Sequence, residues 1–277
     1  MRSGSLFAAF GAAPSLLPNI LFALYCILSV CVYISLIWQI SARTAESSAE
    51  PVKRFGLPEA ILAAALVCYL LLAISASASR PLVQLHTRDL VANLIFTVVI
   101  VLIVVAFLRL RGFNLSALGG FFRISFLRAV VTGILLILAA YPLIAAAEAI
   151  TQTFFGSGSS KQNIVEFFSA SPTIVQRIVI IVFAVAIAPV VEEFLFRFFL
   201  YGVFKRYFGR LIGIFANALL FAAAHTHFPS FVPLFVLGSC FTIAYEWSGS
   251  ILVAMTMHSL FNMVSLIVLA FPDLFPQ

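Results

Sequence analysis

Long apolar runs are the feature that most limits what this chain can fold into. Eight such runs occur, separated by short segments rich in proline, glycine, serine and charged residues. A helix needs about 20 apolar residues to cross a bilayer, and a helix bonds its own backbone polar groups inside lipid. We therefore predict an all-α, polytopic membrane protein whose eight transmembrane helices are Leu17–Ile40, Glu59–Ala78, Val91–Leu108, Ala129–Ile150, Ile174–Phe204, Leu211–Thr226, Phe231–Trp247 and Ile251–Phe271.

The composition excludes other classes of protein. Of the 277 residues, 63% are apolar and only 9% are charged, whereas about a quarter of the residues in a soluble domain are charged. An ordinary soluble protein and a disordered chain are both excluded. The net charge of +6 comes mainly from cations in the loops, so we expect the lipid bilayer as the partner of the chain and no binding of nucleic acid.

The distribution of these cations predicts the orientation of the chain. Four cations, Arg2, Arg80, Arg88 and Lys161, belong to one side. Ten belong to the other, in the first, third and fifth loops: Arg43, Lys53, Arg54, Arg109, Arg111, Arg123, Arg128, Lys205, Arg206 and Arg210. The positive-inside rule places the odd loops in the cytoplasm and both termini outside. The short loops and the apolar N-terminal segment favour a prokaryotic cell membrane.

Ionisable side chains inside the apolar runs cluster in the second half of the chain. Each costs about 2.5–3.5 kcal/mol at the centre of a membrane helix, so each is a candidate functional residue. Counted from the nearest cytoplasmic loop at about 1.5 Å per residue, the key positions lie at depths of about 15–22 Å in a core about 30 Å thick. Three predicted helices thus bring polar side chains to one level, namely Glu192, Glu193, Arg197, His225, His258 and Asn262.

The spacing within the fifth run separates two roles for the glutamates. Glu193 and Arg197 are four residues apart with the acid first, which favours an ion pair along one helix face. Glu192 points about 100° away from its neighbour. Glu192 can therefore face a cavity and act as a general base, while Glu193 neutralises the arginine.

The last run adds a second polar pair on one face. His258 and Asn262 are four residues apart, and an imidazole beside an amide can stabilise a developing oxyanion. In the fifth run, Pro189 leaves a backbone carbonyl without its donor, which inside a membrane is tolerated against protein or a wet cavity. The alternative interpretation is that these side chains are hydrogen-bonding contacts between helices.

Three short patterns resemble the motifs of a known family. The residues EEFLFR at 192–197 resemble its EExxxR motif, FAAAH at 221–225 its FxxxH motif, and HSLFN at 258–262 its HxxxN motif. The family is the CAAX protease and bacteriocin-processing (CPBP, or Abi) family of intramembrane proteases, which includes the Ras-converting CAAX endopeptidases. The resemblance divides the chain into 1–173, four transmembrane helices of unassigned role, and 174–271, a protease-like core.

The resemblance implies a glutamate-dependent endopeptidase. Glu192 and His225 would activate the attacking water, His258 and Asn262 would stabilise the oxyanion, and the Glu193–Arg197 pair would support the site. The implied substrate is a membrane-associated, or in some family members prenylated, peptide or protein.

A metal and two other functions remain open from the residues alone. No HExxH motif occurs, so no cofactor is required, although two histidines and a glutamate also suit a zinc ion. A catalytically silent membrane scaffold or chaperone-like protein could use the same helices for packing. A transporter is disfavoured because the sequence contains no inverted repeat.

Overall fold

The computed structural model describes residues 16–43, 54–78, 87–155 and 173–271, and within these ranges every regular element is helical. This agrees with the predicted all-α class. The elements are α1 (Leu16–Ala42), α2 (Leu57–Ala78), α3 (Thr87–Leu110), α4 (Leu115–Leu118), α5 (Phe126–Phe155), α7 (Ile174–Val182), η2 (Phe183–Ile187), α8 (Ala188–Glu193), η3 (Phe194–Leu200), α9 (Tyr201–Phe208), α10 (Arg210–Ala224), η4 (Phe228–Ser230), α11 (Phe231–Ser248) and α12 (Ile251–Ala270).

Each of the eight predicted runs forms a helix, but one is too short to span a bilayer. Seven helices of the described chain are long and apolar enough to cross, the longest running continuously over 174–208 through α7, η2, α8, η3 and α9. The predicted span Leu211–Thr226 is the 15-residue helix α10, which is about 22 Å long and falls short of a core about 30 Å thick. In the described chain, the expected eight spans are thus seven candidate spans and one short apolar helix.

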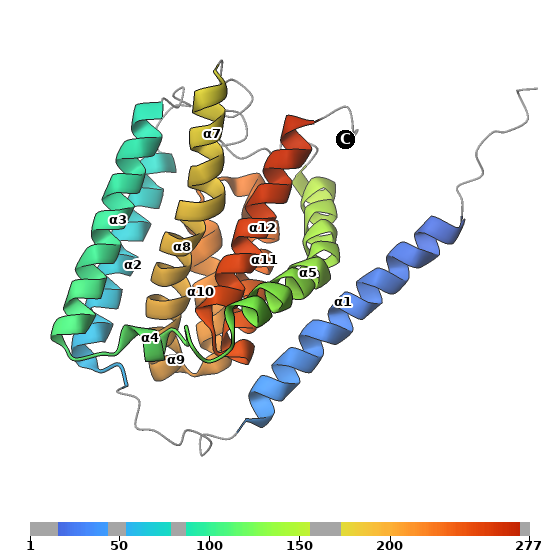
Figure 1. The fold of residues 1–277 in the computed structure, drawn as a ribbon. Helices are drawn as coiled ribbons and strands as arrows, with labels where there is room; N and C mark the ends of the chain where they lie inside the picture. Colours follow the sequence, from blue (N-terminus) through green and yellow to red (C-terminus); the bar gives the residue numbers. More distant parts are fainter. Residues whose placement is uncertain (1–15, 44–53, 79–86, 156–172, 272–277) are drawn as a thin grey trace, which may run out of the picture.

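The helices form a bundle around α11 and η3 (Figure 1). Helix α11 packs against α10, α12 and α5, while α1 lies obliquely along α5 and α11. Helices α2 and α3 lie together at the edge of the bundle, where the ring centroids of Tyr69 and Phe96 are 5.5 Å apart. All seven residues of η3 are buried, so this part of the fifth run lies in the core.

The irregular segment between α3 and α5 closes one end of the bundle. Its backbone joins the start of α12, because the amide of Ile251 donates to the carbonyl of Gly119 over 2.9 Å. Gly120 has φ +62°, and a Cβ built there would lie 1.8 Å from the carbonyl oxygen of Gly249. The contact that positions the start of α12 therefore requires glycine at position 120.

We predict that Gly120→Ala destabilises the protein more than Gly209→Ala does. Both glycines have positive φ, but a Cβ at Gly209 meets nothing within 4 Å. Gly209→Ala should cost about 1–3 kcal/mol for its positive-φ backbone, and Gly120→Ala should cost a further amount of about 1–3 kcal/mol for overpacking. Thermal unfolding of the purified variants in one detergent measures the difference, and equal melting temperatures would contradict the close contact.

Candidate active site

The helix that carries the two glutamates is interrupted twice by π-helical segments. Segment η2 precedes α8 and η3 follows it, so Glu192 and Glu193 occupy the short α-helical piece between them. Such π segments are frequent at functional sites. The side chain of Glu192 is 28% exposed and that of Glu193 is fully buried, so the two glutamates face different surroundings, as their spacing predicts.

Glu193 is the centre of a buried network of charged groups. Its Oε1 accepts a hydrogen bond from Arg197 over 2.8 Å, which confirms the predicted ion pair. The same oxygen lies 2.9 Å from Nδ1 of His258 on α12. Glu193 and Arg197 are fully buried and His258 is nearly so. One carboxylate therefore joins the fifth run to the last helix.

The guanidinium of Arg197 is held by groups that the spacing argument did not identify. Its NH2 group donates to the carbonyl of Gly238 on α11 over 3.2 Å. Its Cζ lies 4.2 Å from the ring centroid of Phe221 and 5.2 Å from that of Phe241, distances at which a cation is attracted to an aromatic face. Phe221 is the first residue of the FxxxH pattern, which was the available signal for its role.

His225 lies at the point where α10 ends. Its Nδ1 is 2.8 Å from the carbonyl oxygen of Phe221. The next residue, Thr226, has φ +52° and is the one non-glycine residue with positive φ in the described chain. A β-branched residue rarely adopts this conformation, and such strain clusters at functional sites. The short α10 thus ends with an imidazole directed into the bundle.

The imidazoles of His225 and His258 lie close to the carboxylate of Glu192. Its Oε2 lies 4.0 Å from Nε2 of His225 and 3.9 Å from Nε2 of His258. This oxygen is buried and has no hydrogen-bond partner. The distances are too long for direct hydrogen bonds, and a bridging water is the usual occupant of such a gap.

The partners of the two histidines determine which ring nitrogens face Glu192. In His225 the acceptor of Nδ1 is a backbone carbonyl, and in His258 it is the Glu193 carboxylate. Both partners only accept, so each Nδ1 carries a hydrogen. The Nε2 atoms of both rings are then left to exchange hydrogen bonds with whatever occupies the gap beside Glu192.

Asn262 joins the site in a way that its spacing did not indicate. Its Nδ2 donates to the carbonyl of Ala184 in η2 over 2.8 Å. In η2 the amide of Ala188 bonds the carbonyl five residues earlier. In that register the carbonyl of Ala184 would pair with residue 189, which is proline and has no N–H. Asn262 supplies the missing donor, and its second amide hydrogen remains available.

The donor set does not fit a metal ion in this arrangement. Among the residues that the structure describes, no three histidine, cysteine, aspartate or glutamate side chains are placed to hold one. Glu192, His225 and His258 come closest in chemistry, but the imidazoles lie 3.9–4.0 Å from the carboxylate oxygen. The expectation that no cofactor is required, with zinc as the alternative, stays an untested prediction, and no step below depends on a metal.

Comparison with known proteins finds a similarity over about a third of the chain. Residues 174–264 match the family model described as type II CAAX prenyl endopeptidase Rce1-like. The match contains all three motifs and confirms the resemblance to the CAAX proteases. No curated protein and no solved structure gives a significant match. Residues 174–264 are thus similar to the CAAX endopeptidases within a multi-pass membrane protein, and the division at residue 173 stays a prediction.

We predict that the cost of Asn262→Ala depends on Pro189. In the wild-type background the substitution leaves the Ala184 carbonyl without a partner, and a buried unpaired group costs about 1–3 kcal/mol. In a Pro189→Ala background the backbone supplies a donor, so the same substitution should cost less than half as much. A double-mutant cycle on melting temperatures measures this coupling. Equal costs in both backgrounds would contradict the pairing.

We predict that Arg197→Ala abolishes the stable fold. It leaves the buried Glu193 charge facing His258 alone, and breaking a buried ion pair costs about 3–5 kcal/mol. Arg206→Ala removes an exposed arginine of α9 and serves as the control, with an expected change within about 0.5 kcal/mol. Membrane abundance and detergent melting curves compare the two, and a normally stable Arg197→Ala protein would count against this role.

Proposed function

We propose that this chain, which carries a type II CAAX prenyl endopeptidase Rce1-like domain at residues 174–264, is an intramembrane endopeptidase that hydrolyses peptide bonds with an activated water. The observation that supports this most strongly is the convergence of Glu192 Oε2 with the Nε2 atoms of His225 and His258 at 4.0 and 3.9 Å. A carboxylate and two imidazoles around one gap are groups that can remove, hold and return a proton.

In the proposed mechanism, the water occupies the gap between these three atoms. With both histidines neutral, Glu192 Oε2 and the two Nε2 atoms would be three acceptors around a water that has only two hydrogens. One additional proton, placed on Nε2 of His258, turns that atom into a donor. The remaining acceptors, Glu192 and His225, then orient the attacking oxygen.

The charges of the buried network favour the same protonation state. Glu192 and Glu193 carry two negative charges, and Arg197 and a protonated His258 carry two positive ones. Their sum is zero, and paired charges are far less costly to bury than an uncompensated one. Glu193, which contacts both cations, is therefore proposed to hold His258 in its protonated form.

The protons and bonds balance in two steps. Water adds to the scissile carbonyl carbon while Glu192 accepts one proton, and the oxygen that becomes negative is met by the Nε2 hydrogen of His258 and the second amide hydrogen of Asn262. The carbon–nitrogen bond then breaks as the proton passes from Glu192 to the leaving amine. The products are a carboxylic acid and an amine.

The surroundings of the site support a route for water. The α10 helix ends at His225, and non-helical backbone at membrane depth is tolerated only against protein or a water-filled cavity. We propose a membrane-associated peptide or protein as substrate. Prenylation of the substrate and location in a prokaryotic cell membrane stay predictions.

We predict that Glu192→Gln abolishes proteolysis without lowering the abundance of the protein. The amide keeps the size of the side chain but cannot accept the proton of the water. Protein termini in host membranes that contain wild type or Glu192→Gln at matched levels can be compared by mass spectrometry. Termini found only with wild type would establish cleavage and identify the substrates.

The same comparison separates the enzyme from a catalytically silent scaffold. A scaffold that uses the glutamate for packing would lose abundance in Glu192→Gln and would produce no new termini in either sample. Glu148→Gln, which alters an acidic residue of α5 outside the site, is the matched control and should keep the wild-type termini. Identical termini in all three samples would overturn the proposed activity.

A further inference from the structure

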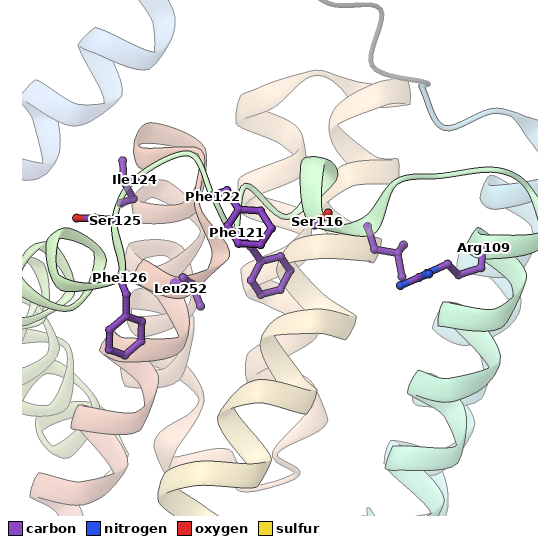
Figure 2. Close-up of a pocket in the computed structure, with 9 residues that line it drawn as sticks. Arg109, Ser116, Phe121, Phe122, Ile124, Ser125, Phe126 and Leu252 are labelled. Atoms are coloured by element: carbon purple, nitrogen blue, oxygen red, sulfur yellow. The ribbon is translucent and has the colours of Figure 1, made fainter.

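Two hollows flank the first turn of α5, away from the site described above. Both lie at the end of the bundle where α4, α9 and the start of α5 gather (Figure 1). The larger has a volume of about 750 Å³ and the smaller about 480 Å³. In Figure 2 the rings of Phe121 and Phe126 and the side chain of Leu252 project below the loop that forms the larger hollow. The smaller is lined by Arg43, Ile124, Leu127, Arg128, Val131, Thr132, Trp247 and Ser248.

The smaller hollow is positively charged. Arg43 and Arg128 are both exposed, and no acidic side chain lines the hollow. Arg43 gives one N–H to the carbonyl of Trp247 over 2.8 Å, which leaves four of its five donors for other acceptors. Two guanidinium groups with donors to spare form a site suited to phosphate.

The rest of the lining is suited to the boundary between lipid and water. The indole nitrogen of Trp247 donates to Gln39 over 2.9 Å, which fixes the indole ring in the wall of the hollow. Tryptophan is enriched at the interface between membrane and water. From the hollow, an exposed apolar stripe continues along α5 through Leu127, Val131 and Leu135 at four-residue spacing. The charged hollow and the apolar stripe of α5 together are complementary to a molecule with a charged headgroup and an apolar chain.

We propose that the smaller hollow binds an anionic phospholipid of the cytoplasmic leaflet. Its headgroup phosphate lies between Arg43 and Arg128, and its acyl chains follow the exposed stripe of α5. Negative charge complements the two arginines, and the apolar track distinguishes a lipid from a free phosphate ion. Basic pockets between membrane helices are known to hold such headgroups. This site is independent of the proposed peptidase activity.

The alternative explanation is that these arginines only obey the positive-inside rule. Arg206 tests this, because it is an exposed arginine of the same predicted cytoplasmic side and lines neither hollow. A diffuse attraction of cations to anionic lipid would treat Arg206 and Arg128 alike. A specific binding site would be weakened by substitution of Arg128 but not by substitution of Arg206.

The test uses the tryptophan in the wall of the hollow as a reporter. The chain has two tryptophans, and Trp38 is 70% exposed, so full-length Trp38→Phe retains only Trp247. This protein is placed in nanodiscs of phosphatidylcholine with increasing fractions of brominated phosphatidylglycerol or, separately, brominated phosphatidylcholine. Bromine quenches the fluorescence of an indole that it contacts. Arg128→Gln and Arg206→Gln are then made in the same background.

The expected result is quenching at a lower mole fraction of brominated phosphatidylglycerol than of brominated phosphatidylcholine. Arg128→Gln should raise the phosphatidylglycerol fraction needed for half-quenching about fivefold, from the contribution of one basic residue near the membrane surface. Arg206→Gln should leave it unchanged. Equal quenching by both lipids, an equal shift in Arg206→Gln, or loss of the preference on adding inorganic phosphate would overturn the proposal.

Discussion

The carboxylate of Glu193 is the group on which the arrangement of the protease-like core depends. It accepts from Arg197 and lies 2.9 Å from His258, and Arg197 in turn bonds the carbonyl of Gly238. A buried charge without an opposite charge beside it is costly, and these contacts pair the buried glutamate with the buried arginine. These contacts connect the helix of the EExxxR motif with α11 and α12. The carboxylate that neutralises Arg197 therefore also positions His258.

Departures from regular helix are concentrated where the polar side chains meet. Segments η2 and η3 flank the glutamates, and α10 ends at His225 beside a threonine with positive φ. Asn262 bonds a carbonyl that Pro189 leaves without a donor. In the interior of a regular helix every backbone N–H and C=O group is paired, so none is left to bond water in a membrane. The irregular backbone therefore accompanies the polar contacts on which the proposed hydrolysis depends.

The two hollows beside α5 belong to a different part of the molecule. Leu252, which lines the larger hollow, precedes His258 by six residues on α12, or about 240° around the helix. The larger hollow and His258 thus lie on different sides of α12. One end of the bundle carries the proposed lipid site, while the centre holds the proposed chemistry.

Much of this protein could be predicted from sequence, because apolar length and the cost of buried charge are local properties. The eight helices, the Glu193–Arg197 pair and the different directions of the two glutamates follow from hydropathy and from residues per turn. Tertiary structure alone decided the rest. One such feature is the end of α10, which leaves this helix too short to cross. The others are contacts between distant helices: Phe221 and Gly238 hold Arg197, and Asn262 bonds Ala184. Spacing along one helix carries no information about which side chain of another helix meets it.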